Sequence, residues 1–389
     1  MGQENSSDEA LRILMAAGVP RRREAGAAAI IYQLADRCRR WGHQVDCLFL
    51  EDLGPYDGVP ARFTDAAYGF RLARYVRQNG ANYSVVNLHA PWGFAHAMTR
   101  RFSSLGSAPP YVLTLQGAEE RYVHAMRREA KKGRAPYFRW KNRLWHRAYH
   151  MQMYNRAIRG ADYAIVANRE AAASLQLAHG LDAERVWFVP NGVDESFFVP
   201  RTSTGDGSRL LFVGTWLDRK GIYYLRDAFV RLAAARPHLR LTIAGCLVAE
   251  PEVRSWFPEA LADRLSVRPF VPVGEMPRVY AEHDIFAFPS LMEGMPLSLL
   301  EAMASGMAVV TTDTCGMSDL VEDGYNGLLV KPACLEALLE ALERVAGDAG
   351  LRARLGGRAC ETARRYGWDE VGRAYLAVLD RAARKRGPH

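Results

Sequence analysis

The feature that most constrains the fold is an alternation of short apolar runs with helical patterns, which occurs twice along the chain. In the first half, six runs are typical of strands, at 11–16, 45–50, 84–88, 111–115, 163–167 and 186–189. A second series has such runs at 209–213, 239–244, 266–270, 285–288 and 308–312. Strands that alternate with helices favour parallel sheets. The sequence therefore predicts an α/β fold with two Rossmann-like, doubly wound domains.

The helical patterns and the polar stretches give the expected domain limits. Apolar residues at helical spacing predict helices at 26–40, 222–235, 276–283, 296–305 and 335–346. The segment VPRTSTGDGSR lies between the two series and is short, polar and rich in turn formers. We expect a polar tail at 1–10, a first domain at 11–197, a linker at 198–208, a second domain at 209–365 and a final helix within 366–389.

Composition narrows the class of protein. The 389 residues exceed what one core usually organises, and 49% hydrophobic with 24% charged residues is typical of a globular chain. The six cysteines are dispersed and form no C-x-x-C pair, so they predict reduced thiols. The net charge of +8 suggests an anionic partner. No apolar run approaches the roughly 20 residues that span a bilayer, and the N-terminus does not resemble a signal peptide, which predicts a cytoplasmic protein.

The strongest local motif is PSLMEGMPLSLLEAMASG at 289–306, which follows an apolar strand and opens a helix. Pro296 suits the first helical turn and Gly306 suits the left-handed stop. The helix N-terminus then lies at the carboxyl end of a parallel strand, where such sheets bind ligands and where helix N–H groups favour phosphate. Glu293 and Glu301 would flank that ligand at different depths. From the spacing alone, two solvated glutamates remain the alternative.

This stretch resembles the E-x7-E signature of retaining GT-B glycosyltransferases of family GT4. Three further segments resemble the same family in order: VPNGVD at 189–194, FVGTWLDRKG at 212–221 and EDGYNGLLVKP at 322–332. The resemblance implies a cleft between the two domains and a C-terminal helix that crosses back to the first domain. It also implies retaining transfer of a hexose-type sugar from a UDP- or GDP-linked donor to an unidentified acceptor, either lipid-linked or a small metabolite.

The resemblance also implies roles for individual residues. Glu293 would contact the transferred sugar, Glu301 the ribose, and Lys220 with Arg219 the diphosphate. The remaining donor-binding positions are Gly214, Gly294, Met295 and Leu297. In the first domain, the family match places His89 with the catalytic residues, with a satisfied structural histidine as the alternative. It places Gly26 and Gln116 in the acceptor or phosphate loop. Asn191 and Asp194 read as residues that fix the turn before the linker.

Two departures from the family pattern keep other functions open. Thr215 stands where relatives commonly have Arg, and Gln116 where many have His. Because Gln cannot accept a proton, residue 116 cannot act as a base. The departures leave a catalytically silent binding protein on the same fold as one alternative, and another GT-B activity, an inverting transferase or a sugar-nucleotide epimerase, is the other. The sequence contains no D-x-D motif, so we predict a metal-independent reaction without a cofactor, in which Lys220 and helix-terminal N–H groups stabilise the leaving group.

A basic segment at 121–147 carries ten Lys or Arg residues against one acid, Glu129, with Tyr137, Phe138, Trp140 and Trp145 between them. Cations with aromatic anchors suit peripheral contact with an anionic membrane, which would place the protein at the inner face. A solvated face with its aromatics in the core is the other interpretation. The chain carries no nucleic-acid-binding module, so we predict no nucleic acid partner.

Overall fold

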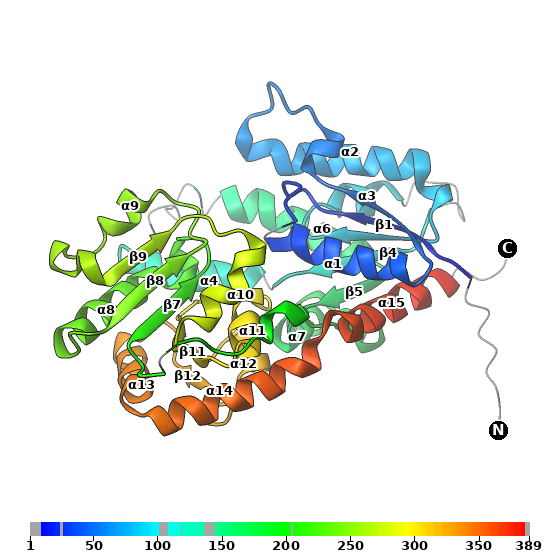
Figure 1. The fold of residues 1–389 in the computed structure, drawn as a ribbon. Helices are drawn as coiled ribbons and strands as arrows, with labels where there is room; N and C mark the ends of the chain where they lie inside the picture. Colours follow the sequence, from blue (N-terminus) through cyan, green and yellow to red (C-terminus); the bar gives the residue numbers. More distant parts are fainter. Residues whose placement is uncertain are drawn as a thin grey trace, which may run out of the picture.

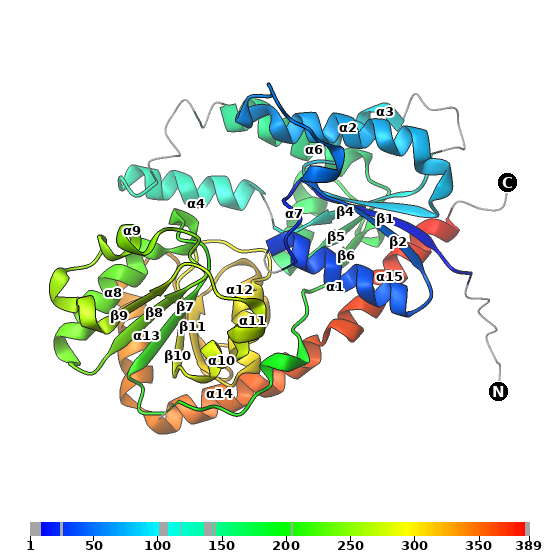
Figure 2. The same cartoon turned by 45° about the horizontal axis from the view of Figure 1, so that its top comes forward.

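The computed structural model describes residues 9–23, 26–100, 108–117, 119–135, 142, 145–203 and 205–385. They form two parallel six-stranded sheets that lie side by side with helices on their faces (Figures 1 and 2). The first sheet has the order β2-β1-β3-β4-β5-β6. Its strands are β1 (Arg12–Ala16), β2 (Gln44–Leu48), β3 (Val85–His89), β4 (Tyr111–Leu115), β5 (Tyr163–Val166) and β6 (Val186–Phe188).

The second sheet has the order β12-β11-β10-β7-β8-β9. Its strands are β7 (Arg209–Val213), β8 (Arg240–Ala244), β9 (Leu265–Arg268), β10 (Ile285–Phe288), β11 (Ala308–Thr312) and β12 (Leu328–Val330). The order of the strands reverses between the neighbours β7 and β10, because the chain adds β8 and β9 on one side of β7 and then places β10 on its other side. Parallel sheets bind ligands at such a switch point, outside the carboxyl ends of the strands.

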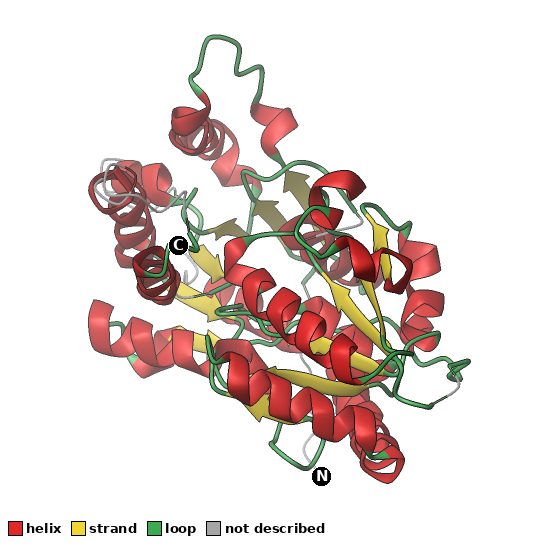
Figure 3. Ribbon diagram, turned by 90° about the vertical axis from the view of Figure 1, so that its left-hand side faces the viewer, coloured by secondary structure: helices red, strands yellow, loops and turns green. Residues whose placement is uncertain are grey.

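Amphipathic helices cover both sheets, as Figure 3 shows. In α1, for example, Ile30, Ile31, Leu34 and Cys38 are buried, a spacing that turns one helix face to the sheet. In the first half of the chain the α-helices are α1 (Gly26–Arg40), α2 (Thr64–Asn79), α3 (Phe94–Thr99), α4 (Glu119–Lys131), α6 (Met151–Gly160) and α7 (Arg169–His179). In the second half they are α8 (Ile222–Ala235), α9 (Glu250–Arg254), α10 (Met276–Ala281), α11 (Leu297–Ala304), α12 (Cys315–Leu320), α13 (Leu335–Gly347), α14 (Ala349–Ala363) and α15 (Trp368–Arg384).

The last helix, α15, leaves the second domain and packs on the first, beside α1 (Figure 1). Its side chains Trp368, Val371 and Leu379 are buried in the first domain's core. The hydroxyl of Tyr375 donates a hydrogen bond of 2.8 Å to the side-chain oxygen of Asn87 on β3. The predicted fold class, two Rossmann-like domains with a C-terminal helix that crosses back, is therefore confirmed.

The two connections between the domains touch each other. The backbone N–H of Val193, before the linker, donates to the carbonyl of Tyr366, before α15, at 2.8 Å. The first sheet's last strand ends at Phe188 and the second sheet's first strand begins at Arg209. The domain limits expected from the sequence are compatible with these positions and otherwise stay predictions.

In the described part of the basic segment, one side of α4 packs against the second domain, while Arg127, Arg128 and Lys131 are exposed. Met126 of α4 and the nearby Ala135 are buried in the second domain's core. Glu129 is only 2% exposed and accepts hydrogen bonds of 2.9 Å from the hydroxyl of Tyr224 on α8. Lys132 donates to the same hydroxyl at 2.7 Å. The sequence could not show this, because the partner surface lies about a hundred residues further along the chain.

For other parts of that segment, the sequence-based predictions are not tested by the structure. Tyr137, Phe138 and Trp140 lie outside the described residues, and Trp145 stacks on Tyr149 with 4.5 Å between ring centroids. Membrane contact through 121–147 stays a prediction. In the parts of the chain that the structure describes, no helix is both long and apolar enough to cross a membrane.

Candidate functional site

A cavity of about 1040 Å³ opens between the two domains. Among its lining residues are all those expected to form the site except His89. The second domain contributes the end of β7, the loop after β10 and the start of α11, which meet at the switch point of its sheet. The first domain contributes the opposite wall, which includes Gly26 and Gln116.

Lys220, Arg219 and Glu293 form a compact charged cluster in this cavity. The side-chain nitrogen Nζ of Lys220 lies 2.9 Å from Oε1 of Glu293, and Nη1 of Arg219 donates to the same oxygen at 2.6 Å. Ser290 adds a hydroxyl donor at 2.8 Å. The lysine also lies over the ring of Phe288, with 4.9 Å to its centroid. The expected diphosphate cations are therefore together, and in the ligand-free protein both contact Glu293.

Two glycines let the chain form this cluster. Gly214 ends β7 with φ of 146°, a backbone conformation that favours glycine, and a Cβ there would lie 3.5 Å from the Lys220 ammonium group. Gly221 has φ of 71°, and a Cβ there would lie 1.9 Å from the carbonyl oxygen of Pro289. The short helix η9 (Asp218–Lys220) is thus pressed against the loop that carries Glu293.

Burial and charge act in opposite directions on these groups. Burial lowers the pKa of Lys220, with Arg219 acting in the same direction and Glu293 opposing both. Burial alone would raise the pKa of Glu293, but the positive charges of Lys220 and Arg219 and the hydrogen bonds from Lys220 and Ser290 outweigh it, so its pKa is lowered. Glu293 is therefore ionised at neutral pH, between two cations.

Helix α11 brings Glu301 to the cavity one turn below its N-terminus. The hydroxyl of Tyr280 on α10 donates to Oε2 of Glu301 at 2.7 Å. Burial raises the pKa of Glu301 to about 7, although the Tyr280 hydrogen bond opposes the shift. Pro296 is the N-cap residue and does not take the first helical position. The helix therefore begins one residue later than the sequence predicted. Leu297 is the first helical residue, and the N–H groups of Leu297 and Ser298 precede the first helical hydrogen bonds, which Leu299 and Leu300 donate to the carbonyl of Pro296.

First-domain amides hold the loop that precedes α11. The side-chain amide of Asn191 donates to the carbonyl of Met295 at 2.8 Å, and that of Asn168 to the carbonyl of Gly294 at 2.9 Å. A Cβ at Gly294 would lie 1.3 Å from the carbonyl oxygen of Gln116. The sequence interpretation of Asn191 as a residue that fixes the turn before the linker stays a prediction, and the structure adds a contact of its amide with the other domain. The neighbouring residues in VPNGVD do not indicate that Asn191 binds the carbonyl of Met295.

His89 lies behind the cavity wall. It ends β3 and is buried, while its neighbours Ala90 and Pro91 line the cavity. Burial lowers the pKa of His89 to about 4, so the imidazole is neutral at pH 7. Its Nδ1 makes no hydrogen bond to any described residue. A role in the reaction stays a prediction for His89 and would need movement of the wall.

Three of the exposed apolar side chains on the cavity's second-domain side lie beyond strands β8 and β9 and were not expected from the sequence. They are Leu247, Phe270 and Val273, which are 52%, 64% and 45% exposed. They follow β8 and β9, at the carboxyl ends of parallel strands. Apolar surface of this kind, next to a few polar groups, is typical of a site for a small organic ligand. Their position after strand ends was the available signal.

Two family models match most of the chain. Residues 25–197 match the model described as Glycosyltransferase Family 4, and residues 207–348 match the model described as Glycosyl transferases group 1. The fold, with a ligand-sized cavity between two Rossmann-like domains, is that of the GT-B class. The chain belongs to the group 1 glycosyltransferases of family GT4.

Curated relatives carry the name D-inositol 3-phosphate glycosyltransferase. That of Xylanimonas cellulosilytica is 32% identical over 251 residues, or 59% of each chain, and that of Kribbella flavida is 31% identical over 240 residues, or 57% of each. The matched region thus spans less than two thirds of these relatives' length.

Solved structures share the fold across nearly the whole chain. Sucrose-phosphate synthase from Thermosynechococcus elongatus superposes with a TM-score of 0.75 at 19% identity, covering 95% of this chain and 98% of that one. The Anabaena protein HepE, solved in complex with UDP-glucose, superposes with a TM-score of 0.69 at 18% identity, covering 95% and 100%. At these identities the likeness concerns the fold.

Proposed function

We propose that this chain is a retaining glycosyltransferase that moves a hexose from a nucleotide sugar, UDP- or GDP-linked, to an acceptor bound on the first domain. The observation that carries the proposal is the cluster of Lys220, Arg219 and Glu293 beside Glu301 in the interdomain cavity. Two adjacent cations suit a diphosphate, and a carboxylate one helical turn inside α11 suits ribose hydroxyls. The apolar side chains Leu247 and Phe270 would then contact the base.

The proposed reaction breaks the bond between the anomeric carbon and the phosphate oxygen. The diphosphate leaves with the electron pair, and the acceptor oxygen forms its bond on the same face of the sugar. Its proton passes to the leaving phosphate oxygen, so that no enzyme base is needed. Lys220 and Arg219 stabilise the charge that develops on the diphosphate, and each such preorganised donor contributes about 3 kcal/mol at the transition state.

The second cation also accounts for Thr215. Relatives commonly have Arg at this position, but here Arg219 reaches the same cluster from the next turn. Both Thr215 and Arg219 line the cavity. The site therefore keeps two positive charges for a diphosphate without a divalent cation, which supports metal-independent transfer.

We place the acceptor on the first-domain wall. That wall includes Arg23, Gly26 at the N-terminus of α1, and Gln116. A guanidinium and a helix N-terminus both favour an anionic group. Because the curated relatives are named for an inositol phosphate acceptor, phosphorylated cyclitols belong in the first acceptor panel, together with simple sugars and lipid-linked acceptors.

The test is a calorimetric screen of UDP, GDP and ADP and their hexose conjugates on EDTA-treated protein, followed by transfer assays with the acceptor panel. We expect one nucleotide to bind, transfer to persist in EDTA, and the product to keep the donor's anomeric configuration by NMR. An inverted product would indicate an inverting transferase, and interconverted donor sugars an epimerase. Nucleotide binding without turnover on any acceptor or water would indicate a silent binding protein. Each of these outcomes would overturn the proposal.

A further inference from the structure

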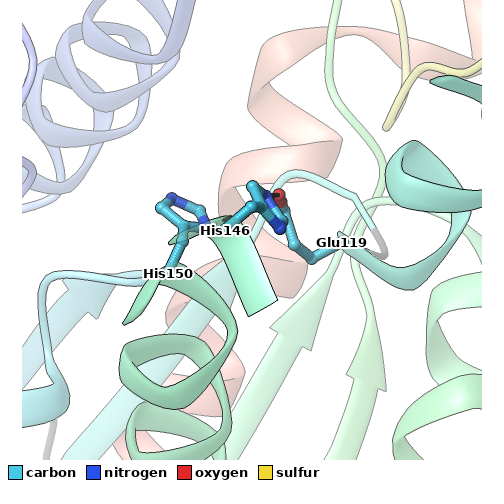
Figure 4. A group of neighbouring side chains, drawn as sticks. All are labelled: Glu119, His146 and His150. Atoms are coloured by element: carbon cyan, nitrogen blue, oxygen red, sulfur yellow. Dashed lines mark hydrogen bonds and ion pairs between the residues drawn. The ribbon is translucent and has the colours of Figure 1, made fainter. Parts of the chain in front are cut away.

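Three side chains with metal-ligand chemistry lie together on the first domain, away from the charged cluster of the second domain. Glu119 is the first residue of α4, and His146 and His150 lie on the π-helical turn η6 (His146–His150) that leads into α6. Figure 4 shows the three side chains gathered where these two elements meet. Glu119 and His146 are 27 positions apart in the chain, so only the four-residue spacing of the two histidines is visible in the sequence.

The ligand atoms are close enough for one small ion. Nε2 of His146 lies 2.8 Å and Nδ1 of His150 lies 3.5 Å from Oε1 of Glu119, and one ligand atom from each residue falls within 4.8 Å of the others. Around a tetrahedral zinc ion with bonds near 2.1 Å, neighbouring ligand atoms stand about 3.4 Å apart. The two measured distances lie on either side of that value, so a small shift of the rings would complete the geometry.

We propose that Glu119, His146 and His150 form a site for a divalent transition-metal ion of the zinc class. Imidazole nitrogens select zinc and its neighbours over magnesium and calcium, which prefer oxygen ligands. Three protein ligands leave a fourth position for water or a substrate oxygen. The site lies on the first domain and does not depend on the proposed transfer reaction.

A second observation separates this cluster from an ordinary histidine–glutamate pair. Nδ1 of His150 is shielded from solvent yet makes no hydrogen bond to any described residue, although it faces the Glu119 carboxylate. By contrast, His179 lies 3.0 Å from Glu120, and among the described residues that pair has no third ligand. Buried polar atoms in proteins generally have partners, so an open ring nitrogen beside two other ligand atoms points to an absent ion.

The site is connected to the interdomain cavity. Glu119 lines the cavity together with the neighbouring Tyr122 and Tyr154. The π-helical conformation of the turn with the two histidines is itself a rare feature that is often found at functional sites. An ion there would tie the start of α4 to the start of α6 on the acceptor side of the cavity.

The test uses the full chain without a polyhistidine tag. Protein stripped with EDTA is given zinc chloride, dialysed against metal-free buffer and analysed for metal per chain by mass spectrometry. We expect one zinc per chain in the wild type, and visible absorption bands after cobalt substitution. His146→Ala, His150→Ala and the near-isosteric Glu119→Gln should each lower zinc affinity at least about tenfold.

His179→Ala is the matched control, because it removes a histidine from a neighbouring glutamate pair and should retain zinc. Nucleotide binding by each variant reports that the second domain is folded and is expected to be unchanged. Absence of zinc from the wild type, full zinc retention by Glu119→Gln, or equal zinc loss in His179→Ala would each overturn the proposal. These results are independent of transfer activity, so they leave the proposed function to its own test.

Discussion

The ammonium nitrogen of Lys220 lies 2.9 Å from the carboxylate of Glu293 in the ligand-free cavity. Arg219 donates to the same carboxylate oxygen. The two cations that we assign to the donor diphosphate are thus already paired with protein. Glu293 neutralises both cations, and a bound diphosphate would have to compete with it for their charge.

This competition predicts an unusual behaviour for Glu293→Ala. Breaking a buried ion pair by removing one partner costs about 3 kcal/mol, because the remaining charge is buried and unpaired. We expect the ligand-free variant to melt at a lower temperature, nucleotide diphosphate to raise its melting temperature more than it raises that of the wild type, and turnover to fall. Thermal denaturation with and without nucleotide measures this, with the exposed Glu340→Ala as control. An equal nucleotide shift in variant and wild type would contradict the competition.

Lys220→Met should leave a folded protein with weak activity. Methionine fills the buried space beside Phe288, so the loss is mainly one of charge. We expect kcat/KM to fall about a hundredfold, the usual effect of removing one preorganised electrostatic donor. Arg219→Met should lose less, because this side chain is about one third exposed. Steady-state kinetics measures both, with the exposed Lys331→Met as control. A fall no larger than that of the control would remove Lys220 from the reaction.

The raised pKa of Glu301 predicts pH-dependent donor binding. Its carboxyl titrates near pH 7 in the ligand-free protein, and ribose hydroxyls would donate to the ionised form. The dissociation constant of a nucleotide sugar should therefore fall as pH rises to about 7 and stay constant above it. Calorimetry across this range tests the effect, and Glu301→Gln should remove it. A pH profile that is the same in the variant would assign the titration to another group.

The raised pKa of Glu301 affects stability in the opposite direction, because a rise in pH strengthens donor binding but lowers the stability of the folded protein. The pKa of Glu301 in the folded protein lies above that of an unfolded glutamate, so the folded state keeps its proton longer. The stabilisation from this proton is complete below about pH 4.5 and is lost as pH rises to about 7. Glu301→Gln should therefore lessen the decline in stability across that interval.

Much of the fold follows from local sequence patterns. The predicted helix at 26–40 and the strands at 111–115, 209–213, 285–288 and 308–312 have the limits that the structure shows. Their ends are set by neighbouring residues, such as Gly42 with its positive φ after α1. The strand β12 (Leu328–Val330) was missed, because three residues after a turn-forming Asn-Gly carry too little periodicity to predict a strand.

The site was only partly predictable, because its assembly depends on contacts between distant residues. The motif with Glu293 and Glu301 lies in one segment, and its residues reached the cavity as expected. Asn168 and Asn191 act from the first domain, and nothing in their own neighbourhoods indicates the carbonyls that they bind. His89 matched a strand end, but whether that end opens into a cavity depends on how the following Ala90 and Pro91 fold.

Gly294→Ala should impair closure of the domains. A Cβ at this position would lie 1.3 Å from the carbonyl oxygen of Gln116, which is backbone and cannot rotate away. The domains must then separate, which disrupts the alignment of donor and acceptor. We expect transfer to fall by more than nucleotide affinity does, as kinetics and calorimetry on one sample would show. Gly357→Ala, where nothing lies within 4 Å of the added atom, is the control and should be active.

The last prediction concerns Asn191, whose amide crosses from the first domain to the Met295 carbonyl. If the second domain formed the donor site alone, this residue would not affect nucleotide binding. Because it holds the loop before α11, we expect Asn191→Ala to weaken nucleotide binding about tenfold, the effect of losing one buried hydrogen bond. Asn326→Ala is the control: that amide is equally buried, bonds to Leu320 and Thr362, and does not line the cavity. It should lower stability without changing nucleotide affinity. Equal affinity losses in the two variants would mean that Asn191 acts only through general stability.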